Sequence, residues 1–264
     1  MNPEIDFTIR RLGKTRHPSP LANVRFVRDD EQILYDIQYD NYKSRDPQAG
    51  MADLVTMELA GPRKRLYFDP KKVTAGIVTC GGLCPGINNV IRSLFMQLHF
   101  QYGVPVILGF RYGFRGILKD SKPGPRTLTI RDVEPIHNLG GSILASSRGS
   151  SDPVGLVDGL VHHGIDLLFT IGGDGTIRGS IDIEVEITRR NLDIAVINIP
   201  KTIDNDIPFT SKSFGFQTAF TEAVKSIRCA HNEAKGAPNG IGIVKLMGRE
   251  SGFIAALATL AQED

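Results

Sequence analysis

The chain has 264 residues, of which 41% are hydrophobic and 23% are charged, so it has the composition of a globular protein with one large or two small domains. Its formal net charge of +2 argues against a nucleic-acid or membrane-surface protein. There is no apolar run long enough to span a membrane, no signal-peptide core, and only three cysteines, so we expect a cytoplasmic protein without a disulfide framework.

Residues 1–70 differ from the rest of the chain. They contain charged and turn-forming clusters such as VRDDEQ (27–32) and DNYKSRDPQAG (40–50), and their hydrophobic periodicity is weak. We interpret them as an N-terminal extension with short helical or strand pieces. Residues 71–264 are interpreted as one α/β domain.

From residue 73 onward, short apolar segments alternate with amphipathic ones. The predicted strands are residues 73–80, 104–110, 165–173, 192–200 and 240–246. The predicted helices are residues 86–100, 176–191, 217–235 and 251–262. Within the first helix, Val90, Leu94 and Leu98 share one face by their spacing. This alternation predicts a Rossmann-like parallel sheet covered by helices on both faces.

Polar, glycine-rich turns follow four of the predicted strands. They are CGGLCPG (80–86), GGDGT (172–176), PKTIDND (200–206) and MGRESG (247–252). In open parallel sheets, ligands bind at the carboxyl ends of the strands. Four such turns on one predicted edge therefore indicate a single active site.

Two segments suit the binding of phosphate groups. TIGGDGT (170–176) runs from a strand into a helix, and its glycines and helix N-terminus suit a phosphate, while Asp174 suits Mg²⁺ beside it. Arg148, in GGSILASSRGS (140–150), could pair with a polyphosphate through two hydrogen bonds. The alternatives are a plain capped turn and a solvated surface arginine. The chain has neither a P-loop nor a dinucleotide fingerprint.

PKTIDND places an ammonium group and two carboxylates in one short turn. Taken alone, it could be a solvated turn, since Asp, Asn and Pro favour turns for backbone reasons. Phosphoryl transfer needs a metal holder, cations on the phosphates and a proton acceptor. Asp174 is the candidate for the first role, Arg148, Lys201 and Arg249 for the second, and Asp204 for the third.

The four segments GGLCPGIN, GGDGT, PKTIDNDI and MGRESGFIA together resemble the 6-phosphofructokinases. The resemblance is closest to the ATP-using group of plants and trypanosomes, and it runs in the family's order from about Gly61 to the C-terminus. It implies phosphoryl transfer from ATP to the 1-hydroxyl of fructose 6-phosphate, giving fructose 1,6-bisphosphate and ADP in glycolysis. It also implies Mg²⁺ as cofactor and a homo-oligomer.

Family roles carry over to the residues that match its motifs. The resemblance implies ATP contacts at Gly81, Arg148, Gly149, Gly173, Asp174, Gly175 and Thr176, with Asp174 as the metal ligand. It implies sugar contacts at Thr202, Ile203, Asp204, Asp206, Met247, Gly248 and Arg249. The implied catalytic groups are Asp204 as the base, Lys201 and Arg249.

The choice of phosphoryl donor depends on two positions. Pyrophosphate-using relatives carry an aspartate where Gly175 stands, and a carboxylate there would repel the α-phosphate of ATP. They share the lysine at the position of Lys201. The combination of Gly175 with Lys201 looks like the plant and trypanosome ATP group. The chain departs from the family pattern at Ala145, where glycine is usual, and at Gln217, where aspartate is usual.

The family continues, beyond the position of Asp264, into a second α/β domain that completes the sugar-phosphate site. We therefore expect this chain to be incomplete at its C-terminus and to have little activity alone. Two alternatives remain open, namely a pyrophosphate-dependent enzyme and a truncated, non-catalytic nucleotide-binding chain. NAD and lipid kinases also carry GGDG turns, but PKTIDND and MGRESG do not fit them.

Overall fold

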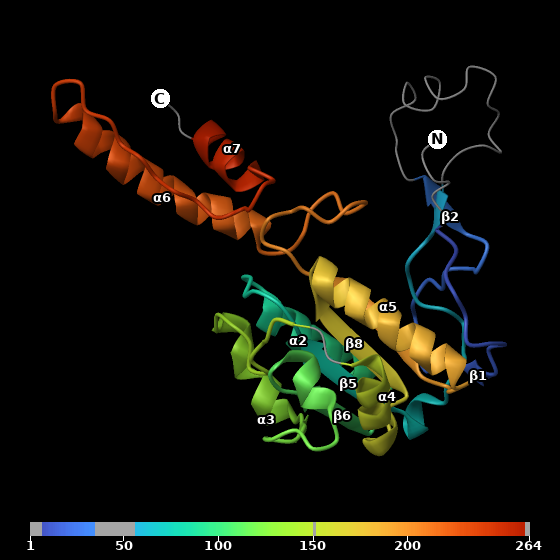
Figure 1. Ribbon diagram of the computed structural model, residues 1–264. Helices are drawn as coiled ribbons and strands as arrows, with labels where there is room; N and C mark the ends of the chain where they lie inside the picture. The colour runs from blue at the N-terminus through green and yellow to red at the C-terminus, as the bar shows by residue number, and fades with distance from the viewer. Residues whose placement is uncertain (1–6, 35–55, 150–151, 262–264) are drawn as a thin grey trace. The chain divides into compact units, whose positions relative to one another are not determined.

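The computed structural model describes residues 7–34, 56–149 and 152–261 (Figure 1). The chain divides into two compact units. The first comprises Met1–Lys72 with Gln101–Gly103, and the second comprises Val73–Phe100 and Val104–Asp264. None of the helices in the described ranges combines the length and the apolar character that crossing a membrane requires.

The first unit contains four short strands. They are β1 (His17–Pro18), β2 (Gln32–Leu34), β3 (Thr56–Glu58) and β4 (Arg65–Leu66). β1 pairs with β4 and β2 pairs with β3, both antiparallel. The predicted short strand pieces are therefore present here. The cluster at residues 40–50 lies outside the described residues.

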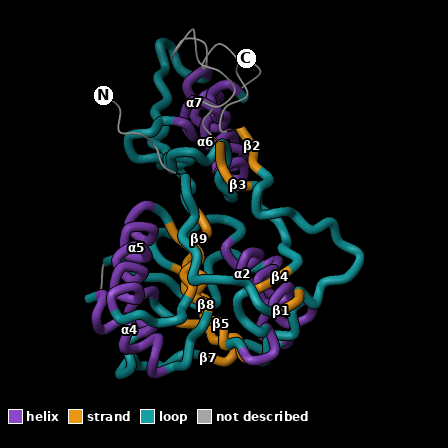
Figure 2. Tube along the Cα trace, turned by 90° about the vertical axis from the view of Figure 1, so that its right-hand side faces the viewer, coloured by secondary structure: helices purple, strands orange, loops and turns teal. Residues whose placement is uncertain are grey.

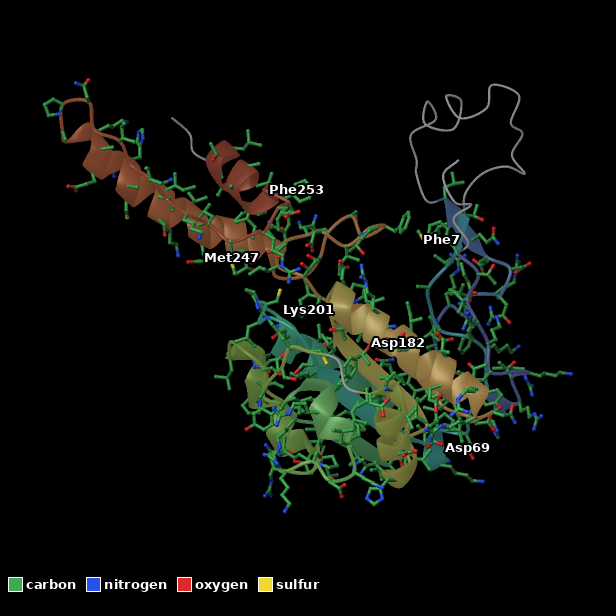
Figure 3. The ribbon with its side chains drawn as sticks, in the orientation of Figure 1. Phe7, Asp69, Asp182, Lys201, Met247 and Phe253 are labelled. Carbon is green, nitrogen blue, oxygen red and sulfur yellow. The ribbon has the colours of Figure 1, made fainter. Side chains whose placement is uncertain are left out.

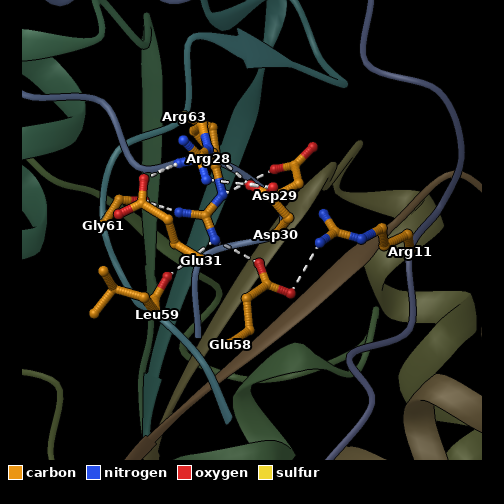
Figure 4. Close-up of polar contacts among 9 residues, drawn as sticks. All are labelled: Arg11, Arg28, Asp29, Asp30, Glu31, Glu58, Leu59, Gly61 and Arg63. Atoms are coloured by element: carbon orange, nitrogen blue, oxygen red, sulfur yellow. Dashed lines mark hydrogen bonds and ion pairs between the residues drawn. The ribbon is translucent and has the colours of Figure 1, made fainter. Parts of the chain in front are cut away.

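Arg63 is the centre of a polar network in this unit (Figure 4). Its guanidinium donates to Asp29 Oδ1 at 3.0 Å, to Glu58 Oε1 at 2.5 Å and to two backbone carbonyls. Arg11 donates to the second oxygen of Glu58 at 2.8 Å. The network links β3 to the segments before β2 and after β3. The planar, rigid guanidinium group of Arg63 suits this role because it can donate several hydrogen bonds at once.

The second unit is built on a five-stranded sheet with strand order β7-β6-β5-β8-β9. Its strands are β5 (Thr74–Thr79), β6 (Val106–Phe110), β7 (Arg126–Thr127), β8 (Leu167–Gly172) and β9 (Ala195–Pro200). All pairs are parallel except β6 with β7. The predicted α/β class and its parallel sheet are confirmed, with one short antiparallel strand at an edge.

Helices cover both faces of this sheet. The helices of this unit are α2 (Ile87–Met96), α3 (Ile130–Val133), α4 (Pro153–His162), α5 (Asp174–Arg189), α6 (Phe216–Lys235) and α7 (Phe253–Leu260), of which α6 and α7 pack against each other. A π-helical turn, η3 (Gln97–Gln101), extends α2, and 3₁₀ turns form η2 (Pro70–Lys72), η4 (Gly113–Ile117) and η5 (Pro135–Asn138). Figures 1 and 2 show α4 and α5 on one face of the sheet and α2 on the other.

The main core lies between the sheet and the helices α4 and α5. Leu168 of β8, Leu160 of α4 and Ile183 of α5 are all fully buried there. A glycine of α4 allows this helix to approach η4 closely. A Cβ atom on Gly159 of α4 would come within 2.1 Å of the Ile117 carbonyl oxygen of η4.

The buried face of α2 differs from the predicted one. Its buried side chains are those of Ile87, Asn88, Ile91 and Phe95. Val90 and Leu94 are only partly buried, although Leu98 in the π turn is buried as expected. The helix carries two apolar stripes about one residue apart, and tertiary packing, not spacing, selects between them.

The predicted strand at residues 240–246 is wrong. Ile241 is 86% exposed and Ile243 is 89% exposed, and the segment is not part of any strand. It runs against the backbone of α6, where a Cβ on Gly240 would lie 2.0 Å from the Ala234 carbonyl oxygen. Alternating apolar residues form a strand only when another strand offers its edge, and none of the described strands pairs with this segment.

Candidate active site

A cavity of about 1010 Å³ lies where β5, β8 and β9 end. All of the site residues predicted from the sequence line it, namely Gly81, Arg148, Gly149, Gly173, Asp174, Gly175, Thr176, Lys201, Thr202, Ile203, Asp204, Asp206, Met247, Gly248 and Arg249. Figure 3 labels three lining residues, which come from three elements: Asp182 of α5, Lys201 after β9, and Met247 before α7. The sheet therefore places three of the four motifs at one edge, and the segment before α7, which follows no strand, brings the fourth motif, MGRESG, to the same cavity.

Backbone hydrogen bonds tie the first glycine turn to the loop that carries Arg148. Gly81 N donates to the Ser147 carbonyl at 2.9 Å, and Ser146 Oγ donates to the Gly81 carbonyl at 2.6 Å. Gly81 has a φ of 81°, which favours glycine. A Cβ on Gly82 would lie 3.7 Å from Arg148 Nη2, so the guanidinium sits directly beside this turn.

The second glycine turn begins α5. Gly173 is the N-cap and Asp174 the first helical residue, so the helix directs its free N–H groups and positive dipole end toward the cavity. A Cβ on Gly175 would meet nothing within 4 Å. No contact within the chain therefore requires glycine at position 175. The space in front of Gly175 is part of the cavity. Thr176 is only 6% exposed and lies against Gly172.

Lys201 connects three of the turns. Its side chain is buried and Nζ donates to the Gly82 carbonyl at 2.6 Å, while its backbone N–H donates to the Gly172 carbonyl at 2.9 Å. Burial lowers the pKa of the Lys201 ammonium group. Arg148 and Arg249 add to this lowering, which places all three cations around one space.

Asp204 is a buried carboxyl group with charged neighbours of both signs. Burial raises its pKa, and the nearby Asp206 raises it further. Arg249 and Lys201 oppose the shift, with Arg249 Nε 3.6 Å from Asp204 Oδ2. The two carboxylates have different partners, because Thr202 Oγ1 donates to Asp206 Oδ1 at 2.7 Å. Asp204 is therefore the better candidate for accepting a proton.

Two serines that sequence reasoning missed hold the TIDND turn. Ser213 Oγ donates to the Thr202 carbonyl at 2.5 Å, and its N–H donates to Asn205 Oδ1 at 2.7 Å. Ser251 Oγ donates to the Asp204 carbonyl at 3.1 Å. These contacts span 8 to 47 positions of sequence, beyond the spacing of a single turn, so local patterns give no signal for them.

Other missed lining residues did leave a signal. Arg178 and Asp182 line the cavity along α5, four and eight positions after Asp174. Helical spacing puts these three side chains on one face of α5. The prediction that Asp174 faces the site therefore also indicates that Arg178 and Asp182 face it. The remaining missed residues are Cys80, Gly82, Leu83, Phe114, Ser147, Gly179, Lys245 and Leu246.

The fold and the cavity define an α/β protein with a polar, glycine-rich cavity at the carboxyl edge of a parallel sheet. The phosphofructokinase family model matches residues 74–263. The chain belongs to the phosphofructokinase family, so the predicted resemblance is confirmed.

Relatives with similar sequences are named ATP-dependent 6-phosphofructokinases. The chain is 49% identical to that of Amycolatopsis methanolica, over 97% of this chain and 57% of the relative. It is 44% identical to that of Trypanosoma brucei brucei, over 97% of this chain and 53% of the relative. ATP-dependent 6-phosphofructokinase 7 of Arabidopsis thaliana is 52% identical over 78% of this chain. The chain thus spans about half the length of the curated relatives it matches.

Solved structures share the fold at lower sequence identity. Pichia pastoris phosphofructokinase in the T-state has a TM-score of 0.63 at 21% identity, covering 81% of this chain and 23% of the other. A pyrophosphate-dependent phosphofructokinase from Marinobacter aquaeolei has a TM-score of 0.61 at 22% identity, covering 73% of this chain and 50% of the other. At this identity the likeness shows the fold alone.

Proposed function

We propose that the protein transfers the γ-phosphoryl group of ATP to the 1-hydroxyl of D-fructose 6-phosphate, giving fructose 1,6-bisphosphate and ADP. One observation carries the proposal. A single cavity is lined by two glycine turns with Arg148 and also by the buried, charge-flanked Asp204. A kinase needs this combination, because the donor phosphates and the base must meet at one point.

On the donor side, Gly81, Arg148 and the N-terminus of α5 are the proposed contacts of the ATP phosphates. Asp174 is the proposed Mg²⁺ ligand. No group of three metal-ligating side chains occurs among the described residues. One or two carboxylates with substrate phosphates are what Mg²⁺ uses, so the residues present fit an ion that arrives with the nucleotide. Bound there, Mg²⁺ would neutralise phosphate charge.

On the acceptor side, Asp204 is the proposed general base for the sugar hydroxyl. Its raised pKa makes it a stronger base than an exposed carboxylate, and Arg249 beside it can attract the sugar phosphate or stabilise developing charge. Lys201 is proposed to stabilise the transferring group. The proposed sugar contacts are Thr202, Ile203, Asp206, Met247 and Gly248.

The proposed base is tested by replacing Asp204 with serine in a chain extended to the full length of its relatives. We expect kcat to fall by roughly 10²-fold or more, because a positioned base contributes about that factor, while fructose 6-phosphate binding falls less. The measurement is a coupled assay for fructose 1,6-bisphosphate with ATP as donor. If kcat of the variant stays within a few-fold of that of the unchanged protein while KM rises, Asp204 is a binding residue. If the unchanged protein turns over faster with pyrophosphate than with ATP, pyrophosphate is the donor.

The proposed donor is tested at Gly175. We expect Gly175→Asp to weaken Mg–ATP binding much more than pyrophosphate binding, because the new carboxylate would project into the open space where the nucleotide phosphates lie. Isothermal titration calorimetry with each donor measures both affinities. Gly175→Asn is the matched control for size without charge. Equal loss of both donors with Gly175→Asp contradicts the proposal.

A further inference from the structure

Ser213 is a buried polar residue that lies between the turn PKTIDND and α6. It is 4% exposed and is not among the residues that line the candidate active site. A buried hydroxyl group needs a hydrogen-bond partner. Ser213 Oγ donates to the Thr202 carbonyl at 2.5 Å, and Ser213 N donates to Asn205 Oδ1 at 2.7 Å. Ser213 therefore holds the turn that carries Asp204 at two points.

The Thr202 hydroxyl group contacts both acidic residues of this turn. Thr202 Oγ1 accepts a hydrogen bond from Asp204 N at 3.1 Å and donates one to Asp206 Oδ1 at 2.7 Å. Asn205, between them, has a φ of 54°, in the left-handed region that asparagine adopts more readily than most residues. The positions of both carboxylates thus depend on Thr202 and Asn205, the two residues that Ser213 contacts.

The next two residues of the chain are fixed against the first glycine turn, CGGLCPG. Cys84 Sγ donates to the Phe214 carbonyl at 3.0 Å. A Cβ on Gly215 would lie 2.3 Å from Cys84 Sγ and 2.5 Å from the Pro85 carbonyl oxygen, and Gly215 has a φ of 82°, so this close contact requires glycine. Residues 213–215 therefore join the turn of the proposed donor side to the turn that carries the proposed base.

We propose that Ser213 is a positioning residue, which sets the place of Asp204 relative to the phosphoryl donor. The inference rests on the proposed function, because that function gives Asp204 the role of base. Phosphoryl transfer depends on the alignment of its two substrates, and a displacement of about 1 Å can lower its rate by about 10²-fold. Ser213 does not line the cavity, so it acts through the backbone of the turn and not through a substrate.

A second hydroxyl group shares this restraint. Ser251 Oγ donates to the Asp204 carbonyl at 3.1 Å, and this contact does not involve Ser213. Loss of the Ser213 hydroxyl group should therefore loosen the turn without releasing it. The contact of Phe214 with the first glycine turn uses a backbone carbonyl, which a side-chain substitution at Ser213 leaves in place. We therefore expect the effect on catalysis and not on the binding of Mg–ATP.

The test begins with three single variants in a chain extended to the full length of its relatives. In a coupled assay for fructose 1,6-bisphosphate, we expect Ser213→Ala to lower kcat by about tenfold, with KM for ATP within about twofold. Ser213→Thr keeps the hydroxyl group and should retain kcat to within about threefold. Ser211→Ala is the matched control, because it makes the same change at an exposed serine of the same loop, and it should have no effect.

A double-mutant cycle separates positioning from a general structural role. If Ser213 acts through Asp204, adding Ser213→Ala to Asp204→Ser should change kcat by less than about twofold, whereas independent effects would multiply. Calorimetry with Mg–ATP checks the donor side of each variant, and we expect the affinity of Ser213→Ala to stay within about twofold of that of the unchanged protein.

Four results overturn the inference while leaving the proposed base intact. They are an unchanged kcat in Ser213→Ala, a Ser213→Thr variant as slow as Ser213→Ala, multiplied effects in the double variant, and a loss of Mg–ATP binding equal to the loss of kcat. If Asp204→Ser itself leaves kcat within a few-fold of that of the unchanged protein, the proposed base is wrong and the inference is wrong with it.

Discussion

At the scale of single residues, the chemistry of Asp204 is set by neighbours of opposite sign. Burial and Asp206 raise the pKa of its carboxyl group, while Arg249 and Lys201 lower it. A raised pKa means that the folded state prefers the protonated form. The stability contribution of this group is thus fully present below the ordinary carboxyl pKa and is lost as the pH rises through the raised value.

Removing the two nearest charges should move this pKa in opposite directions. Asp206→Asn removes a repelling carboxylate, so the pKa of Asp204 should fall toward its usual range. Arg249→Gln removes an attracting cation, so that pKa should rise further, although the shift is small because the Arg249 side chain is 73% exposed. Carbon-detected NMR titration of the Asp204 carboxyl group measures both. Shifts of the same sign would contradict the assignment of causes.

The identities of these groups could be read from the sequence, but their contacts could not. The turn PKTIDND places Lys201, Asp204 and Asp206 within six residues, so a polar site was predictable. The hydrogen bond from Lys201 Nζ to the Gly82 carbonyl joins residues 119 positions apart. Such a contact exists only after the sheet has formed, and no local pattern encodes it.

At the scale of single elements, two glycines of α4 offer an internal comparison. A Cβ on Gly159 would lie 2.1 Å from the Ile117 carbonyl oxygen, whereas one on Gly155 would lie 3.5 Å from its nearest neighbour, Leu118 Cδ2. We expect Gly159→Ala to lower the free energy of unfolding by about 1–3 kcal/mol through overpacking. Gly155→Ala should leave it unchanged or raise it by up to about 1 kcal/mol, because alanine favours helices.

Urea denaturation of both variants checks this pair. Similar losses for the two variants would contradict the contact with η4 as the cause of the difference. The Asp152 carboxylate caps the N-terminus of α4 by accepting hydrogen bonds from Val154 N and Gly155 N. Both donors are backbone groups, so neither substitution removes this cap.

Element prediction succeeded where a local signal and the fold agreed. β5, β8 and β9 were predicted because apolar runs lead directly into glycine or proline turns. α4 was not predicted, because its sequence PVGLVDGLVH carries two glycines and lacks a polar face. The strand predicted at residues 240–246 was wrong for the opposite reason. Their alternating pattern is strong, but strand formation requires the edge of a neighbouring strand.

At the scale of the whole molecule, the segment after α6 leaves apolar side chains in solvent. Ile241, Ile243, Met247 and Leu260 are all at least 60% exposed. Such a concentration of apolar surface is unusual in a soluble monomer. We expect the chain to bind a hydrophobic dye and to associate at high concentration.

Ile241→Lys with Ile243→Lys should reduce both effects. Val161→Lys, at a half-exposed valine of α4, is the matched control and should change neither. Dye fluorescence and analytical ultracentrifugation are the measurements. Equal behaviour of the double variant and the unchanged chain would place the association surface elsewhere.

The pairing of β5 with β8 also has a kinetic consequence. Thr74 N donates to Asp166 Oδ2 across 92 positions of sequence, so this parallel pair closes a long loop before the two glycine turns can meet. Long-range closure is slow because chain entropy is lost before contacts form. A nucleotide that touches both turns has no site until closure is complete. We therefore expect such a ligand to slow unfolding while leaving the rate of folding unchanged.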